Sequence, residues 1–331
     1  MTVREQTEKI EQTVLSPLAA LSKNSKGRNS FEEHCPIRTI YQRDCDRIIH
    51  CKSFRRLKHK TQVFLAPEGD HYRTRLTHTL EVAQVARTIA RALRLNEDLT
   101  YAIALGHDLG HTPFGHAGER LLDSVHPKGF KHYEQSLRVV ERLERDGKGL
   151  NLSHEVKDGI LCHTKGKEAS TLEGRIVRIA DKIAYINHDI DDAVRAKLLQ
   201  SCDIPSEITD VLGTSLTKRI NTLVTSVVEN SKDNIMMDDK TQKSFNSLHK
   251  FMFDNVYVTS LAKAEEGKAQ ELLKQLYEYF VKEQTLPPEY DYIIEHEGID
   301  RAVCDYIANM SDVYAMYIYK ELFIPKSWGV L

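Results

Sequence analysis

The spacing of apolar residues constrains the fold of this chain more than any other feature, because from Ser30 onward it is helical rather than alternating. Between Arg75 and Leu95 apolar residues recur every three or four positions, which predicts one amphipathic helix with His78 on its inward side. Further helices are predicted at about 98–109, 132–146, 153–163 and 171–199, and then at about 214–230, 241–258, 264–284, 298–309 and 311–322. We therefore expect an all-α fold.

One short region departs from the helical pattern. Thr61–Leu65 is rich in β-forming residues, and residues 66–70 after it form a turn signal. A small β-hairpin is therefore expected near residues 61–73.

The distribution of histidines suggests how the 331 residues are organised. Thirteen of the fifteen histidines fall between His34 and His188, so catalytic residue types thin out in the last third of the chain. We expect a polar N-terminal segment at 1–30, a catalytic core at 31–200 and a helical C-terminal region at 201–331 packed on that core.

Composition excludes several classes of protein. The 46 Lys and Arg residues nearly balance the 48 Asp and Glu residues, so no global charge requires a nucleic acid or a membrane as partner. The six cysteines form no Cys-x-x-Cys pair, which argues against a disulfide framework or a zinc ribbon. Without a signal-like apolar core or a membrane-spanning run, the sequence predicts a soluble, cytoplasmic protein.

The run from Gly106 to Glu119 combines three histidines, two acids and four glycines in fourteen residues. Its adjacent His107 and Asp108 offer one nitrogen and one oxygen ligand to a divalent metal. A His-Asp pair alone means little, since His188-Asp189 is a second one. The first pair differs because it follows an apolar helix and precedes a glycine-rich turn.

Two inward-facing residues can complete a metal site with this pair. His78 is one, and Asp181 is the other, because it lies among isoleucines and alanines where a carboxylate is costly unless it is paired or binds a cation. Alone, each has a simpler explanation: a core histidine bonded to backbone, or a buried salt bridge. Together, His78, His107, Asp108 and Asp181 suit Mn²⁺ or Mg²⁺, with Fe²⁺, Zn²⁺ or Ni²⁺ as alternatives that ligand chemistry does not separate.

These residues resemble a known family. The order of the four ligands is similar to the metal signature of the HD phosphohydrolase superfamily, and four ordered motifs resemble bacterial dGTPase-like deoxynucleoside triphosphate triphosphohydrolases. The motifs are Arg73–Val82, His107–Glu119, Gly129–Ser136 and Asp181–Asp189. The resemblance covers roughly residues 29–196 and implies an HD-domain helical fold with a variable helical C-terminal extension.

The resemblance also implies an activity and roles for individual residues. That family hydrolyses a dNTP at the α-phosphorus to a deoxynucleoside and inorganic triphosphate, and it forms homo-oligomers. By resemblance His116 is the in-line catalytic histidine, Glu119 orients it, and His111 and His132 are further active-site histidines. The resemblance assigns Lys182 to phosphate, Tyr185 to the sugar, and Asp189 with Gln62 to the 3′ hydroxyl. Arg75, beside His78, is placed to supply a further positive charge for the triphosphate. Simple loop hydrogen bonding remains an alternative for His111 and His132, and a solvated helix face remains one for the stripe of Arg178, Lys182, Tyr185 and Asp189.

Two other functions stay open at this point. Another HD phosphohydrolase or phosphodiesterase acting on nucleotides would share the metal ligands, but the acidic pair or Gly-Tyr-Pro motif typical of those enzymes does not occur here. A nucleotide-sensing or single-stranded DNA-binding assembly protein is the second alternative. The basic segment Lys52–Lys60 contains only Phe54 as an aromatic residue, which favours a solvated or phosphate-facing surface over DNA.

Overall fold

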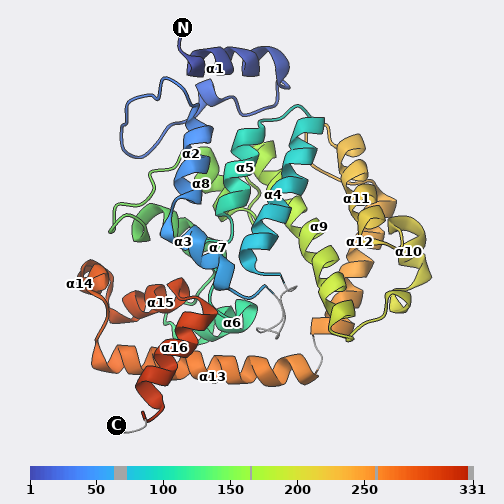
Figure 1. Ribbon diagram of the computed structural model, residues 1–331. Coiled ribbons are helices and arrows are strands. Elements are labelled where there is room, and N and C mark those ends of the chain that lie inside the picture. Colours follow the sequence, from blue (N-terminus) through green and yellow to red (C-terminus); the bar gives the residue numbers. More distant parts are fainter. Residues whose placement is uncertain (63–72, 165, 258–259, 327–331) are drawn as a thin grey trace, which may run out of the picture.

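The structure is a computed structural model that describes residues 1–62, 73–164, 166–257 and 260–326 (Figure 1). Within these ranges the chain is helical, and its only β-type pairings are isolated bridges, Arg28 with Ser153 and Thr61 with Thr74. The predicted all-α class is confirmed. The β-hairpin expected near residues 61–73 falls mostly on residues 63–72, outside the described residues, and next to them the structure shows a single bridge, Thr61 with Thr74.

The described helices follow one another in this order: α1 (Val3–Val14), α2 (Ile40–Ile49), α3 (Lys52–Arg56), α4 (Arg75–Ala92), α5 (Glu97–Gly106), α6 (Gly115–Val125), α7 (His132–Arg138), α8 (His154–Leu161), α9 (Leu172–Arg195), α10 (Ser206–Leu212), α11 (Leu216–Asn230), α12 (Asp239–Met252), α13 (Ser260–Glu283), α14 (Asp291–Glu297), α15 (Ile299–Asn309) and α16 (Asp312–Phe323). Short 3₁₀ turns lie at Ser22–Asn24, Leu57–His59, Ser201–Asp203 and Pro288–Tyr290, and π-helical turns at Val139–Leu143 and Phe253–Tyr257.

The first hydrophobic core lies where α4, α5 and α9 pack together in the centre of Figure 1. The inward stripe of α4 consists largely of small residues such as Ala83, Ala86 and Ala90, all buried, so the neighbouring helices approach closely. Side-chain caps fix where these helices begin, with Asn96 accepting from Leu99 N at α5 and Thr171 accepting from Gly174 N at α9. The core thus brings together α4 and α9, which carry His78 and Asp181, and the C-terminal end of α5, where His107 lies.

A second core lies below the first in Figure 1, where α13 runs beneath α6 and α15. It buries Phe114 and Leu122 from the first half of the chain against Leu273 and Ile307 from the second half. Helices α10–α12 instead bury residues such as Leu223 in the first core. The C-terminal region is therefore shared between two cores.

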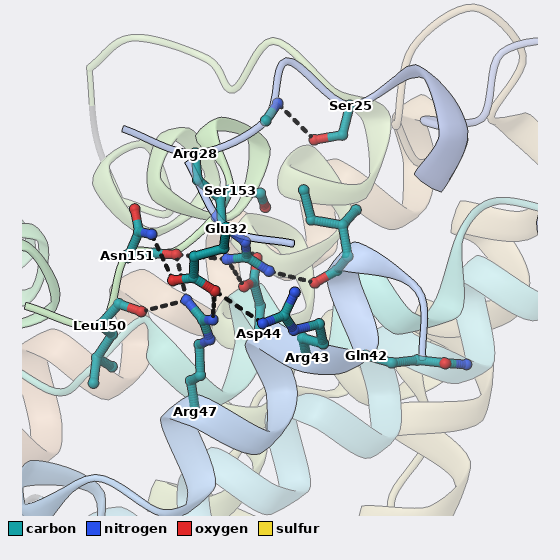
Figure 2. Close-up of polar contacts among 12 residues, drawn as sticks. Ser25, Arg28, Glu32, Gln42, Arg43, Asp44, Arg47, Leu150, Asn151 and Ser153 are labelled. Atoms are coloured by element: carbon teal, nitrogen blue, oxygen red, sulfur yellow. Dashed lines mark hydrogen bonds and ion pairs between the residues drawn. The ribbon is translucent and has the colours of Figure 1, made fainter. Parts of the chain in front are cut away.

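The first thirty residues contain α1, which the sequence pattern did not predict, followed by a segment fixed to the core by charges (Figure 2). The guanidinium of Arg28 pairs with the buried Asp44 carboxylate. The carboxylate of Glu32 accepts from Arg43 at 2.9 Å and also pairs with Arg47. Asn151 donates to Glu32 as well, so this segment is bonded to α2 and to the loop before α8.

Several other helix boundaries differ from the predicted ones. The helix expected at 132–146 ends as a π-helical turn at Val139–Leu143, and the one expected at 241–258 does so at Phe253–Tyr257. Helices α10 and α14 were not predicted, and both end at a glycine with positive φ, Gly213 or Gly298. A helix also begins inside the glycine-rich run, at Gly115, where only a loop was expected.

Candidate active site

Four residues predicted to bind metal meet where α4, α5 and α9 converge. His78 Nε2 lies 3.1 Å from Asp181 Oδ1, and His107 Nε2 lies 3.9 Å from the same oxygen and 3.5 Å from Asp108 Oδ2. An octahedral ion with bonds of about 2.1 Å separates neighbouring donor atoms by about 3.0 Å and opposite ones by about 4.2 Å. These three distances fit ligands of one ion, and His78, His107 and Asp108 each offer a donor atom within 4.8 Å of the other two.

Local structure explains why these side chains face one another. His78 follows the capping box at Thr74 by one turn, and His107 caps the C-terminus of α5, where its Nδ1–H donates to Ala104 O at 2.7 Å. That bond leaves Nε2 of His107 directed at the cluster, buried and with no hydrogen-bond partner in the described part of the chain. A buried lone pair without a partner is what a metal ligand presents before the ion binds.

The charges around the two carboxylates favour their ionised forms. Burial opposes ionisation of Asp108, but His107 and Arg75 hold its pKa well below the usual value. Burial likewise opposes ionisation of Asp181, yet the hydrogen bond to His78 and the neighbouring His107 lower its pKa to about 2. Ionised carboxylates are the form that binds a cation.

Arg75 lies closer to the cluster than the sequence suggested. Its Nη1 donates to Asp108 Oδ2 at 2.6 Å, and its Nη2 donates to the backbone oxygen of Gln62 at 3.3 Å. The side chain is almost fully buried, so its charge neutralises that of the Asp108 carboxylate. Its other nitrogen, Nε, is buried without a partner among the described residues.

A second group of side chains lies on the first turns of α6 and α7. His116 Nδ1 lies 3.1 Å from Glu119 Oε2, one helical turn away, and His132 Nδ1 lies 2.9 Å from Glu119 Oε1. Glu119 therefore contacts two imidazoles, and it also accepts from the backbone nitrogen of His132. The His116 side chain is 57% exposed, so it can reach a bound molecule.

The backbone of the glycine-rich run explains this placement. Phe114 and Gly115 both have positive φ, and the pair of left-handed residues turns the chain sharply into α6. Gly110 lies against α7, where a Cβ atom would come within 2.1 Å of Ser136 N. These features bring α6 and α7 together, which is why Glu119 reaches both histidines.

Electrostatics differ between the histidines of this group. Burial opposes protonation of His132, but the hydrogen bond to Glu119 and its charge raise the pKa of His132. Burial and the charge of Arg75 hold the pKa of His111 well below its usual value. The His111 ring stacks on His132 with centroids 4.9 Å apart, and neither of its nitrogens has a partner in the described ranges. His111 is therefore a neutral, buried imidazole with free hydrogen-bonding capacity.

One histidine of this region was not recognised in the sequence. His163, just beyond α8, is 1% exposed, and its ring lies 5.0 Å from that of His107 and 5.3 Å from that of His132. Burial lowers its pKa to about 3, so the ring is neutral. Only its position at the end of a predicted helix could have drawn attention to it.

The residues of the predicted stripe on α9 differ in their exposure to solvent. Lys182 is exposed, Tyr185 is half-buried, and Asp189 is fully buried, where burial raises its pKa to about 7. Tyr257, which no sequence pattern singled out, stacks on Tyr185 at 5.8 Å and donates its hydroxyl hydrogen to Asp189. The predicted alternative of a solvated face is wrong for Asp189.

Side chains far away in sequence hold the loops of the site in place. Lys60 is buried and donates through Nζ to the backbone oxygens of His111 and Ala308. Asp312 at the start of α16 accepts from Thr61 N at 2.9 Å and from Phe114 N at 2.9 Å. The C-terminal region therefore fixes both the chain before α4 and the turn before α6.

The basic segment Lys52–Lys60 divides between two environments. Lys52, Arg55 and Lys58 are exposed, as a solvated surface requires. Lys60 is the exception, since both of its backbone acceptors lie inside the protein.

No described helix combines the length and the apolarity needed to cross a membrane. All six cysteines are free thiols. The helical fold and the cluster of His and Asp side chains define an HD-domain protein with a divalent-metal site.

Comparisons with known proteins agree with this class. A family model described as HD domain matches residues 75–186, and one described as phosphohydrolase-associated domain matches residues 235–321. A protein named deoxyguanosinetriphosphate triphosphohydrolase-like protein from Caldanaerobacter subterraneus subsp. tengcongensis is 58% identical over 331 residues, covering 99% of this chain and 98% of the relative. A protein of the same name from Clostridium tetani is 47% identical over 340 residues, covering 98% and 97%.

Among solved structures, a phosphohydrolase from Bacteroides thetaiotaomicron shares the fold, with a TM-score of 0.51 at 16% identity over 83% of this chain and 68% of that one. The chain belongs to the dGTPase-like family of HD phosphohydrolases.

Proposed function

We propose that this protein hydrolyses a deoxynucleoside triphosphate at the α-phosphorus, releasing a deoxynucleoside and inorganic triphosphate. The observation that carries the proposal is the exposed His116 bonded to Glu119, whose second partner His132 has a donor atom within 4.8 Å of a donor atom of the proposed ligand Asp108. The names of the two relatives described above support it.

In the proposed site, a metal ion and the protein side chains have different chemical roles. A divalent ion held by His78, His107, Asp108 and Asp181 supplies Lewis-acid chemistry, polarising a phosphate oxygen and favouring ionisation of water near neutral pH. Water attacks the α-phosphorus, the bond to O5′ breaks, and O5′ must gain a proton to leave as a hydroxyl group. His116 is the side chain proposed to move that proton.

Glu119 has a positioning role in this scheme. A carboxylate that accepts from Nδ1–H of His116 fixes the tautomer in which Nε2 faces the substrate, and it stabilises the ring when it carries a second proton. His111 and His132 are proposed to bond phosphate oxygens, since their ring centroids lie 5.2 Å and 6.3 Å from that of His116.

The remaining predicted contacts are proposed to hold the substrate. Lys182 and Arg75 supply positive charge for the triphosphate. Tyr185 packs on the sugar and leaves no room for a 2′ hydroxyl group. Asp189 and Gln62 bind the 3′ hydroxyl, and each has one buried side-chain oxygen, Oδ1 or Oε1, without a partner in the described part of the chain.

Incubation of the purified protein with Mn²⁺ and each of the four dNTPs tests the proposal. Chromatography should detect a deoxynucleoside and inorganic triphosphate in equal amounts, with the matching ribonucleotides hydrolysed far more slowly. Formation of a monophosphate and pyrophosphate, or no turnover with any dNTP, would contradict it.

The His116→Ala variant tests whether His116 acts in catalysis rather than in metal binding. Turnover should fall by about two to four orders of magnitude, because a positioned acid–base group contributes that much. The metal content measured by elemental analysis should stay at the wild-type value. Parallel loss of metal and activity would instead place His116 among the metal ligands.

A further inference from the structure

Lys60 is a buried lysine to which the proposed reaction assigns no role. The residue is 2% exposed, and its Nζ donates to the backbone oxygens of His111 and, at 2.8 Å, of Ala308. Burial and the nearby charge of Arg56 lower the pKa of Lys60 to about 7, so the amine is largely uncharged above neutral pH. A neutral amine has two N–H groups, which match these two acceptors. Lys60 therefore acts in the fold as a hydrogen-bond donor rather than as a charge.

The backbone of Lys60 is itself fixed, so its side chain starts from a defined position. Lys60 N donates to Leu57 O at 3.3 Å, and Lys60 O accepts at 3.0 Å from the backbone nitrogen of Arg75, the first residue of α4. Its side-chain acceptor Ala308 O belongs to the last turn of α15, where carbonyl groups have no partner within the helix. Lys60 thus connects the start of α4, the end of α15 and the turn at His111.

The position of His111 depends on its backbone. Its ring is buried, and neither ring nitrogen has a hydrogen-bond partner in the described ranges, so no side-chain hydrogen bond orients it there. The backbone of His111 makes two bonds instead, since its N donates to Asp108 O at 3.1 Å and its O accepts from Lys60. The His111 ring lies 5.2 Å from the ring of His116 and 4.9 Å from that of His132. A shift of this backbone would therefore move a ring that lies beside both histidines.

The same stretch of backbone continues into α6. Gly115, the first residue of α6, lies close to the chain that follows Lys60, because a Cβ atom there would come within 3.3 Å of Gln62 O. Thr112 Oγ1 donates to Gly115 O at 2.9 Å, and His116 is the next residue. A displacement of the turn would therefore also move the start of the helix that carries His116.

We propose that Lys60 is a positioning residue for the proposed hydrolysis. By holding the His111 carbonyl beside the end of α15, it places the His111 ring and the turn that leads to His116. The inference rests on the proposed function, in which His116 moves a proton and His111 bonds a phosphate oxygen. A simpler role is that Lys60 only satisfies two buried carbonyl groups and so contributes to stability.

Three substitutions separate these two roles. Lys60→Met removes both donors and keeps an unbranched side chain of similar length, and Lys58→Met is the matched control, because Lys58 is exposed in the same segment. Lys60→Gln keeps an N–H₂ group that ends one atom earlier, so we expect it to hold one carbonyl and to behave between Lys60→Met and wild type. It also supplies the measurement if Lys60→Met does not fold. All proteins are compared well below their melting temperatures, so that each is fully folded.

The first measurement is hydrogen–deuterium exchange of the nucleotide-free, full-length protein, followed by mass spectrometry of peptides that cover residues 107–118. These amides should exchange about tenfold faster in Lys60→Met than in wild type, because one or two hydrogen bonds that hold the turn are lost. They should exchange at the wild-type rate in Lys58→Met. Equal exchange in wild type and Lys60→Met would overturn the proposal.

The second measurement is the steady-state kinetics of dNTP hydrolysis with Mn²⁺. Lys60→Met should lower kcat by about tenfold or more, because misplaced groups act poorly in the reaction step. The metal content should stay at the wild-type value, and KM should change less than kcat. A lysine that only stabilises the fold would leave kcat of the folded variant at the wild-type value, and that result would contradict the proposal.

The two measurements separate this inference from the proposed function. If wild type hydrolyses no dNTP, the proposed function is refuted, whereas the exchange result still decides whether Lys60 holds the turn. If wild type hydrolyses dNTP and the folded Lys60→Met variant does so equally well, only the role of Lys60 is refuted.

Discussion

At the scale of single residues, Glu119 connects the parts of the candidate site. Its two carboxylate oxygens contact His116 and His132 separately, and burial does not prevent ionisation, because the hydrogen bonds from these rings hold its pKa far below the usual value. One charged side chain thus orients two imidazoles.

The Glu119→Gln variant tests this arrangement. An amide offers one acceptor and one donor group, so it cannot accept from both rings, and one imidazole must adopt the wrong tautomer. We expect kcat to fall by about two orders of magnitude or more, with a changed pH profile and an unchanged metal content. A kcat within twofold of wild type at every pH would show that this carboxylate is not needed.

Asp189 is proposed to bind the substrate, but its buried carboxylate makes the folded protein less stable once it is ionised. Burial raises its pKa to about 7, so its favourable contribution to folding is full below the unfolded pKa of 3.8 and is lost as pH rises through about 7. Asp189→Asn does not titrate. The variant should therefore gain stability relative to wild type by roughly 2–3 kcal/mol between pH 5 and pH 8.

Urea unfolding at the two pH values measures that difference, and Asp210→Asn, exposed on α10, is the control. The Asp189→Asn variant should also have a higher KM for dNTP, because Asp189 is proposed to bind the 3′ hydroxyl. A stability difference that is the same at both pH values would contradict the assignment of a strained buried carboxylate.

At the scale of elements, the C-terminal helices hold the turn before α6 in place. Asp312 bonds Thr61 and Phe114 at once, although these residues lie 251 and 198 positions away. The left-handed Phe114 backbone then depends on α16 for its support.

The Asp312→Ala variant should lower kcat by at least tenfold and destabilise the protein by about 2–4 kcal/mol, because two backbone N–H groups, one buried and one partly buried, lose their acceptor. Asp239→Ala is a matched control, since Asp239 is also the first residue of a helix but is exposed. Kinetic assays and thermal unfolding of both variants make the comparison. Equal effects of the two substitutions on kcat would show that the loss comes from the helix terminus alone.

The same elements show what can be predicted from sequence. Helical periodicity gave α4, α5 and α9, and the inward positions of His78 and Asp181 follow from that periodicity. The four proposed ligands could thus be chosen from the sequence pattern alone. Lys60, Tyr257 and Asp312 could not, because their partners lie far away in sequence and no local pattern encodes such a contact.

The sequence pattern also failed to predict the helix that begins at Gly115, because the backbone there has an unusual conformation. The run after His107 reads as a loop because its glycines interrupt the apolar pattern, yet α6 begins at Gly115 through two consecutive left-handed residues. His116 and Glu119 therefore lie one turn apart on a helix, which gives their contact its fixed geometry.

At the scale of the whole molecule, the candidate site lies between two hydrophobic cores. Helices α4, α5 and α9 of the first core carry the proposed metal ligands, whereas α6, which carries His116 and Glu119, begins at the edge of the second core. A ligand that contacts both groups should stabilise the assembled molecule.

Binding of Mn²⁺ alone should already raise the melting temperature. An ion that binds only the native state adds about 2.7 kcal/mol at a hundredfold excess over its Kd, which is several degrees for a chain of this size. Calorimetry with Mn²⁺ or with EDTA should show this difference in wild type and not in Asp181→Asn. An equal shift in the variant would mean that the ion binds elsewhere.

In the proposed reaction, water attacks the α-phosphorus of a dNTP. Hydrolysis of dGTP in ¹⁸O-labelled water, followed by mass spectrometry of both products, tests it directly. Attack at phosphorus should place one ¹⁸O atom in the inorganic triphosphate and none in the deoxynucleoside. Label in the 5′ hydroxyl group, or label in a nucleotide monophosphate or pyrophosphate, would contradict it.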